Sequence, residues 1–370
     1  MQGKRARSSG DRVIRIAKRR RTRVVKYRGV PVGGGSPITI QSMTTARTAD
    51  VRGVLREIRA LARAGCELVR VAVKDREDVA ALPAICDTSP IPVIADVHFD
   101  YRLAVEAAKA GAAGLRINPG NIGGVHKVSR VVEAAAAAGI PIRVGVNSGS
   151  IDRSLRAFSR TDPVRALFVS AVRSRKLIER MGFRDLVFSL KSPNAMVTVA
   201  ANRMFAAEND CPLHIGVTEA GPPLSGAARS AVALTLLLSG GIGDTVRVSL
   251  SGDPVREVAA AAAVLSALGL RSDISQIISC PTCGRSWIDV LGISERLERE
   301  IAGVRDGITI AVMGCEVNGP GEAKDADIGL AGSRGGAVLF EKGRILRRLR
   351  GNIVEEFLRE VRNFLLRKGD

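Results

Sequence analysis

The chain has 370 residues, which is too long for one average domain and too short for three, so we expect two domains. Hydrophobic residues make up 46% of the sequence and aromatic residues only 3%, which excludes a disordered chain and disfavours an aromatic-rich β-sandwich. The net charge is +19, and residues 1–28 contribute +11 of it, because twelve Lys and Arg there face one acid, Asp11.

The N-terminal charge predicts a basic flexible arm over residues 1–30, because a short Arg-rich tail is usually solvated. Such an arm can also contact nucleic acid or serve in targeting, but we expect no nucleic-acid partner. No secretory apolar stretch follows it, and the apolar runs Ser230–Gly243 and Val258–Leu270 are shorter than the ~20 residues of a membrane span. We therefore expect a cytoplasmic protein without membrane contact.

From Pro37 to Leu270, a short β-branched run followed by an Ala-, Leu- and Arg-rich helical stretch recurs eight times. The predicted strands are Ile38–Met43, Glu67–Val73, Pro92–Val97, Gly114–Ile117, Pro141–Val146, Leu186–Leu190, Leu213–Val217 and Thr245–Leu250. Eight such units predict an α/β protein with a (β/α)8 TIM barrel over residues 31–270. An open doubly wound sheet is the alternative, but no G-x-G-x-x-G sequence follows the first strand.

The pattern changes after Leu270. We predict a helix over Ile288–Val304, a strand over Ile308–Met313, two short strands and a closing helix over Ile353–Leu366. These elements predict a small α+β domain over residues 271–370.

Polar residues stand where most of the predicted barrel strands end, which is where such barrels place their active sites. Even spacing within Arg116/Asn118, Arg143/Asn147 and Arg247/Ser249 puts both members of each pair on one side of an extended strand. Guanidinium groups suit phosphate oxygens, so the cations predict a phosphorylated substrate. The cations are Arg70, Arg116, Arg143, Lys191 and Arg247.

Two acids leave this interpretation open. The cations can instead be rim residues that pair with Asp96 and Glu219. Glu219 can also be an isolated acid that donates a proton or positions the substrate. His98 fits a structural hydrogen bond as well as a ligand contact.

Six cysteines divide into two groups. Cys66, Cys86 and Cys211 are scattered, whereas Cys280-Pro-Thr-Cys283 and Cys315 lie close together in the sequence. A zinc ribbon would need a second C-x-x-C, and a thioredoxin-type pair belongs near a βαβ start. Three thiolates with one non-thiolate position fit an iron–sulfur cluster, with Glu322 as the oxygen ligand beside Cys315.

The motifs together resemble the 4-hydroxy-3-methylbut-2-enyl diphosphate synthase family of the non-mevalonate isoprenoid pathway. They are Ser-Cys-Pro-Thr-Cys-Gly-Arg, Gly-Cys-x-Val-Asn-Gly-Pro-Gly-Glu-Ala, Pro-Ile-x-Ile-Gln-Ser-Met-Thr, Ala-Asp-Val-His-Phe, Leu-Arg-Ile-Asn-Pro-Gly-Asn and Thr-Glu-Ala-Gly. The resemblance covers about residues 30–345. It implies the compact bacterial form, in which a dihydropteroate-synthase-like barrel is joined to a [4Fe–4S] domain.

The resemblance also implies an activity. This is the two-electron ring opening and dehydration of 2-C-methyl-D-erythritol 2,4-cyclodiphosphate, in a head-to-tail homodimer supplied with electrons by reduced flavodoxin or ferredoxin. It implies cluster ligands at Cys280, Cys283, Cys315 and Glu322, and acid/base or positioning roles for Glu219 and Asp96. The implied substrate contacts are His98, Arg70, Arg116, Asn118, Arg143, Asn147, Lys191, Arg247 and Ser249.

The sequence departs from the family at Glu316, where relatives often have an apolar residue; the added charge would lower the cluster potential.

Two rival functions remain. A basic zinc-ribbon nucleic-acid-binding protein explains the charge but not the barrel, and a cluster-free pterin-synthase-like barrel enzyme leaves the C-terminal domain without a role.

Overall fold

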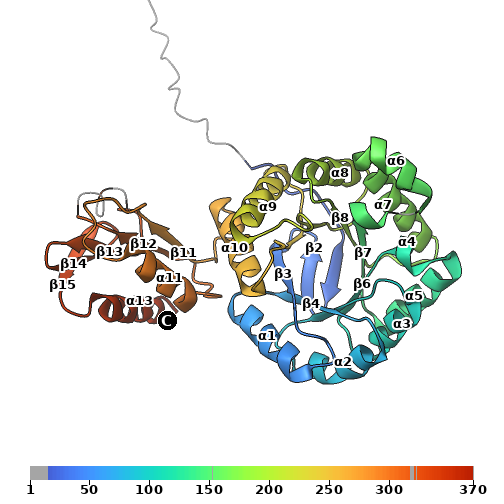
Figure 1. The fold of residues 1–370 in the computed structure, drawn as a ribbon, viewed down its shortest axis with the longest axis horizontal. Coiled ribbons are helices and arrows are strands. Elements are labelled where there is room, and N and C mark those ends of the chain that lie inside the picture. The colour runs from blue at the N-terminus through green and yellow to red at the C-terminus, as the bar shows by residue number, and fades with distance from the viewer. Residues whose placement is uncertain (1–15, 152, 317–320, 322, 370) are drawn as a thin grey trace, which may run out of the picture.

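The computed structural model describes residues 16–151, 153–316, 321 and 323–369. Figure 1 shows a barrel ringed by helices and a smaller domain beside it. The barrel strands pair in parallel in the order β8-β7-β6-β5-β4-β3-β10-β9, and a bridge from Phe188 to Leu213 closes the ring. They are β3 (Thr39–Met43), β4 (Leu68–Ala72), β5 (Val93–Asp96), β6 (Gly114–Ile117), β7 (Ile142–Asn147), β8 (Leu186–Lys191), β9 (His214–Ile215) and β10 (Thr245–Val246).

The predicted barrel is therefore confirmed, although its last two strands are shorter than expected. The backbone after β9 explains the difference. Gly216 has a φ of +152°, and a Cβ placed there would lie 2.1 Å from the Arg247 carbonyl oxygen. The chain approaches its neighbour too closely at this point for a regular ladder to continue.

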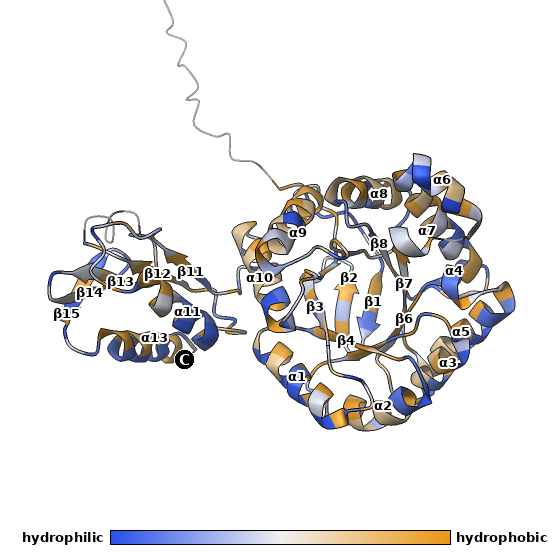
Figure 2. Ribbon diagram, in the orientation of Figure 1, coloured by the Kyte–Doolittle hydropathy of each residue, from blue (hydrophilic) through white to orange (hydrophobic). Residues whose placement is uncertain are grey.

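Helices surround the strands, and their apolar sides pack on the barrel. Asp50, Asp100 and Asp253 accept hydrogen bonds from first-turn amides and so begin their helices. Figure 2 shows mostly hydrophobic colour along the strands and mixed colour on the helices. The helices are α1 (Val51–Arg63), α2 (Arg76–Thr88), α3 (Tyr101–Lys109), α4 (Pro119–Ile122), α5 (Val125–Ala138), α6 (Arg156–Thr161), α7 (Pro163–Glu179), α8 (Ala195–Ala207), α9 (Pro223–Leu238) and α10 (Pro254–Ala267).

A hairpin of β1 (Val24–Tyr27) and β2 (Val30–Gly33) covers the amino ends of the barrel strands. Its apolar side chains pack on Leu68, Ile94 and Val187. Arg19 and Arg23 precede the hairpin and form ion pairs with Asp244 and Glu179, each at 2.9 Å. The expected flexible arm over residues 1–30 is thus wrong for residues 16–30, because apolar packing and ion pairs fix them; residues 1–15 lie outside the described part of the chain.

The C-terminal domain has a five-stranded sheet in the order β11-β12-β13-β14-β15. The first three strands are parallel and the last two antiparallel. Helices α11 (Val290–Glu300) and α13 (Ile353–Gly369) pack on one face of the sheet through Leu297 and Phe357. The strands are β11 (Gln276–Ser279), β12 (Thr309–Met313), β13 (Ile328–Ser333), β14 (Gly336–Glu341) and β15 (Arg344–Leu349). The predicted α+β domain is confirmed, with β11 and β15 as unpredicted strands.

The buried Arg271 and the half-buried Arg305 attach this domain to the flank of the barrel. Arg271 donates to the Ile38 carbonyl at 2.9 Å and forms an ion pair with Asp273 at 2.6 Å. Arg305 donates to the Gly65 carbonyl at 2.7 Å. The small domain therefore lies beside α1 and α10 rather than over the barrel mouth (Figure 1).

None of the helices in the described ranges is long and apolar enough to cross a membrane.

Candidate functional site

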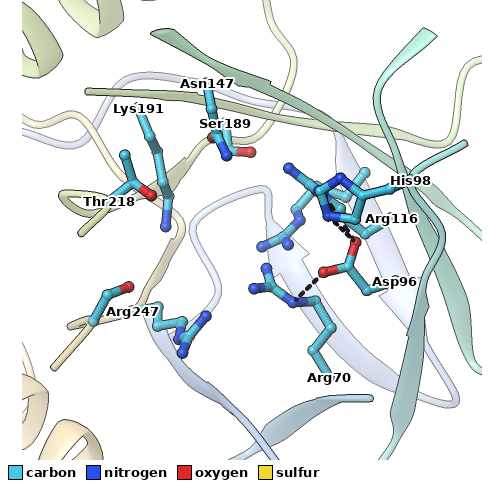
Figure 3. Close-up of a pocket in the computed structure, with 11 residues that line it drawn as sticks. Arg70, Asp96, His98, Arg116, Asn147, Ser189, Lys191, Thr218 and Arg247 are labelled. Carbon is cyan, nitrogen blue, oxygen red and sulfur yellow. Dashed lines mark hydrogen bonds and ion pairs between the residues drawn. The ribbon is translucent and has the colours of Figure 1, made fainter. Parts of the chain in front are cut away.

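The barrel mouth holds a polar cavity at the carboxyl ends of the strands. Figure 3 shows cationic side chains from several strands pointing into one space. The residues that line it are Arg70, Asp96, His98, Arg116, Arg143, Asn147, Ser189, Lys191, Thr218, Arg247 and Ser249. Nine of these eleven were predicted from the strand ends, so the topology brings most of the expected site together.

Asp96 lies between two of the arginines. Its Oδ2 is 3.0 Å from Arg70 Nε, and its Oδ1 is 3.0 Å from Arg116 Nη1. Burial opposes ionisation of this carboxyl, but the charges of Arg70 and Arg116 outweigh it and hold the pKa of Asp96 well below its ordinary value. Asp96 is therefore suited to act as an anion that positions the two guanidinium groups, and its predicted acid/base role stays a prediction.

His98 and Gly145 complete the surroundings of Arg116. Arg116 Nη1 lies 2.6 Å from His98 Nε2, and since an Arg can only donate, the imidazole nitrogen accepts. A Cβ at Gly145 would lie 2.5 Å from Arg116 Nε, so the glycine makes room for the guanidinium. These contacts orient Arg116 toward the cavity.

Two further cations have partners behind the cavity wall. Arg247 makes a bidentate ion pair with the buried Glu257 of α10, at 3.0 and 3.1 Å. Arg143, which is 1% exposed, donates to Gln41 Oε1 at 2.8 Å. Burial, reinforced by the charge of Arg116, lowers the pKa of Arg143 to about 10.

Lys191 has no hydrogen-bond or ion-pair partner among the described residues, and it is only 7% exposed. Burial lowers its pKa well below the ordinary value, and the charges of Arg143 and Arg247 add to the effect. When all five cations are protonated they face two acids, Asp96 and Glu257, which leaves an excess of three positive charges. Such an excess in a buried site is costly, and a bound polyanion would offset the cost.

Buried hydrogen-bond donors without a partner also favour a bound anion. The Nε atoms of Arg116 and Arg143 are buried, and neither has a hydrogen-bond partner in the described structure. Buried donors normally have partners, so these atoms are suited to a ligand that carries acceptor oxygens.

Two predicted site residues lie outside the cavity wall. Asn118 caps α4 by accepting from the Gly120 amide at 3.1 Å, and its amide donates to the Ser150 carbonyl at 2.8 Å. Asn118 keeps the extended backbone that the spacing argument assumed, but its side chain is engaged in these two contacts and does not line the cavity. Glu219 is exposed in the loop after β9, with a φ of +53°, and forms no ion pair with the cations of the described structure.

Sequence reasoning missed the residues that support the cations. Glu257 accepts from Arg247, from Ser42 Oγ at 2.8 Å and from the Leu250 amide at 3.0 Å. Gln41 holds Arg143. Glu257 lies in the first turn of a helix that follows an Arg-bearing strand. That position was the only feature of the sequence that could have indicated its role. Ser189 and Thr218, on the cavity wall, gave no signal.

The cysteine segments of the C-terminal domain follow two neighbouring strands. Cys280 comes directly after β11, and Cys315 comes two residues after β12. These strands are parallel and paired, with Ser279 opposite Val312, so both cysteines emerge at the same edge of the sheet. Thr282, with a φ of +49°, turns the chain within the C-x-x-C segment.

Close packing holds the two segments together. The Gly314 amide donates to Cys280 Sγ at 3.1 Å, and the Trp287 amide donates to the Gly314 carbonyl at 2.8 Å. A Cβ at Gly314 would lie 2.5 Å from Ser286 Oγ. A backbone amide directed at sulfur favours a thiolate, the form that binds iron.

The three thiols are free; Cys315 is buried, Cys280 is half-buried and Cys283 is exposed. No group of three or more His, Cys, Asp and Glu side chains within the described residues is arranged to hold a metal ion. Glu322, the expected fourth ligand, lies outside the described residues. The residues therefore fit a cluster by donor chemistry and common location rather than by a preformed geometry.

The fold and the site define a two-domain (β/α)8-barrel enzyme with an anion-binding mouth and a thiol-bearing second domain. Two family models match the chain, the GcpE TIM-barrel domain over residues 22–262 and the GcpE protein C-terminal domain over residues 276–363. The chain belongs to this family, which confirms the resemblance found in its motifs.

Curated relatives cover nearly the whole chain. A 4-hydroxy-3-methylbut-2-en-1-yl diphosphate synthase (flavodoxin) from Maridesulfovibrio salexigens is 47% identical over 352 residues, which are 95% of this chain and 98% of that protein. The protein of the same name from Geobacter sulfurreducens is also 47% identical, over 94% of this chain and 99% of its own. These relatives do not favour the zinc-ribbon or the pterin-synthase alternative.

Among solved structures, the dihydropteroate synthase of Yersinia pestis matches 66% of this chain and 98% of its own, with 17% identity and a TM-score of 0.43.

Proposed function

We propose that this chain converts 2-C-methyl-D-erythritol 2,4-cyclodiphosphate to 4-hydroxy-3-methylbut-2-enyl diphosphate by reductive ring opening and loss of water. The observation that carries the proposal is the excess of positive charge at the barrel mouth, in a chain whose second domain presents three free thiols. Membership of the family and the names of the curated relatives support it.

The mouth binds and orients the substrate in this proposal. Arg70, Arg116, Arg143, Lys191 and Arg247 contact the two phosphates, because five cations can surround a cyclic diphosphate and the guanidinium groups form bidentate contacts. Asp96 and Glu257 hold three of these cations in place. Exclusion of water from the buried cavity strengthens every one of these contacts.

Shorter polar side chains contact the organic part of the substrate. Asn147 and Ser249 lie on the cavity wall and can bond its hydroxyl groups, as can His98 at the rim. The roles predicted for Asn118 and Glu219 need a local rearrangement, since neither side chain lines the cavity, and they stay predictions.

Cys280, Cys283 and Cys315, together with Glu322, would hold a [4Fe–4S] cluster. When bound, such a cluster supplies electrons one at a time and offers one iron without a thiolate ligand. The chain's own contribution is to keep Cys280 as a thiolate through the Gly314 amide and to fix Cys315 against the sheet.

We further propose a head-to-tail homodimer. The cysteine segments lie in a domain beside the barrel, so they do not cover the mouth of their own chain (Figure 1). A second copy arranged head to tail would bring its cysteine segments to this mouth. Of the two predicted electron donors, reduced flavodoxin is the one named in the relatives. A cytoplasmic location stays a prediction.

The direct test is turnover of the cyclic diphosphate by anaerobically purified protein with a reduced viologen as electron source. We expect the linear diphosphate as product from the wild type and none from Cys280→Ser. Exposed Cys283 and the scattered Cys86 provide a contrast: Cys283→Ser should also be inactive, whereas Cys86→Ser should retain turnover. Turnover by the Cys280→Ser protein would contradict the proposal.

A further inference from the structure

Three exposed arginines gather at one end of the C-terminal sheet. Arg334 lies in the turn between β13 and β14, and Arg348 and Arg350 lie at the end of β15. The pairings of Ser333 with Gly336 and of Ala337 with Leu349 put these positions at the same end. Arg334 and Arg350 have no ion pair among the described residues.

This end of the sheet is also where the cysteine segments emerge. Gly332 packs so closely on Gly314 that a Cβ on it would lie 2.4 Å from the Gly314 carbonyl oxygen. Arg348 lies 3.6 Å from Glu316, which directly follows Cys315. A row of paired residues runs from Met313 through Ala331 and Val338 to Arg348, and three strand spacings make it roughly 14 Å long.

An aromatic side chain adjoins the arginines. Trp287, the single Trp of the sequence, is 58% exposed, although its amide is bonded to Gly314. It lines a groove between the first turns of α11 and α13, and Gly351, which follows Arg350, lines the same groove. Exposed Trp beside Arg is the composition that is enriched at sites of protein recognition.

We propose that Trp287, Arg334, Arg348 and Arg350 form the docking face for an acidic one-electron carrier protein. The inference rests on the proposed function, which requires electrons from outside the chain. Positive charge beside the cysteine segments complements a carrier with acidic residues around its redox group.

Nucleic acid fits this face less well. Binding of a single strand relies on several aromatic side chains on which bases stack, and only one is present here.

Each docked carrier would be oxidised by one electron, which passes to the centre held by the cysteines. Two successive dockings would supply the two electrons that one ring opening consumes.

The test compares two double charge reversals. Arg334→Glu with Arg350→Glu changes the docking face. Arg344→Glu with Arg359→Glu changes the charge equally, at exposed arginines of β15 and α13 that also lack an ion pair within the described ranges. Calorimetry measures the Kd of oxidised flavodoxin for each loaded protein. Iron content, oligomeric mass and viologen-driven turnover are measured in parallel.

We expect the Kd for flavodoxin to rise about tenfold or more in the docking-face variant and to change less than about twofold in the control. Iron content, mass and viologen-driven turnover should match the wild type in both. Equal Kd values in the two variants would overturn the inference. So would loss of the dimer or of viologen-driven turnover in the docking-face variant, which would make this face a contact between copies. A wild type that binds flavodoxin but fails to turn over with viologen would instead overturn the proposed function.

Discussion

Oδ2 of Asp96 lies 3.0 Å from Nε of Arg70, deep in the barrel mouth. The other carboxylate oxygen lies at the same distance from Arg116, so one buried anion holds the buried Arg116 and the largely buried Arg70. The positive charges of the mouth thus surround one fixed negative charge. Removing the charge of Asp96 should therefore lower the stability of the fold first of all.

Asp96→Asn should lower the free energy of unfolding by about 3–5 kcal/mol, because both arginines lose their charged partner while buried. Since the pKa of Asp96 is lowered in the folded protein, its stabilising effect is complete above the ordinary carboxyl pKa and fades as the pH falls below it. Urea unfolding at several pH values measures this. A loss below about 1 kcal/mol at pH 7 would contradict the ion-pair account.

Lys191→Met should have the opposite effect on stability. Lys191 is buried beside other cations, so an apolar side chain of similar length should stabilise the anion-free protein by about 1–4 kcal/mol. Stabilisation by added pyrophosphate should shrink at the same time. Thermal unfolding with and without pyrophosphate measures both effects, and Lys109→Met, at an exposed position on α3, is the matched control. A Lys191→Met protein less stable than the control would contradict the charge-excess account.

Anion binding should take up protons. The pKa of Lys191 is lowered in the anion-free site, and a bound diphosphate raises it again, so Lys191 gains a proton on binding wherever the pH exceeds the lowered value. Affinity for pyrophosphate should therefore fall as the pH rises through that region. Calorimetry in buffers of different ionisation enthalpy counts the protons, and the uptake should shrink in Lys191→Met. Equal uptake in both proteins would assign it to another group.

Gly314→Ala should impair assembly of the cluster site. The new methyl group would collide with Ser286 Oγ, 2.5 Å away, and would displace the amide that donates to Cys280. Adding Ser286→Gly removes the colliding atom and should restore part of the iron content. Iron per chain measures both variants. Full iron loading of Gly314→Ala alone would show that the amide-to-sulfur contact is dispensable.

The sequence predicted the barrel well because its strands are apolar, β-branched and regularly separated by helices. It missed β15, because five of the six residues of Arg344–Leu349 are exposed, so no alternation is visible. The register of β15 on β14 also shifts between Leu339 and Phe340 of β14. It also missed the hairpin of Val24–Tyr27, whose alternating burial is hidden behind a run of arginines. Local composition identifies strands with a buried face, but edge strands depend on their neighbours.

The candidate site likewise contains residues that the sequence predicted and residues that it did not. Arg70, Arg143 and Arg247 were found because they are cations on or directly after otherwise apolar parallel strands, which meet in a barrel. Their supports, Gln41 and Glu257, were not found, because the pairing of Arg247 with a helix residue depends on how α10 packs. The capping role of Asn118 was not foreseen either, because spacing along a strand does not show that a side chain will bond the helix that follows.

The central claim is that Cys280, Cys283 and Cys315 hold an iron–sulfur cluster. Iron and acid-labile sulfide counts in anaerobically purified protein test it most directly. We expect about four irons and matching sulfide per chain, and loss of both in Cys315→Ser. About one zinc per chain without sulfide, or a full cluster in the Cys315→Ser protein, would contradict the account.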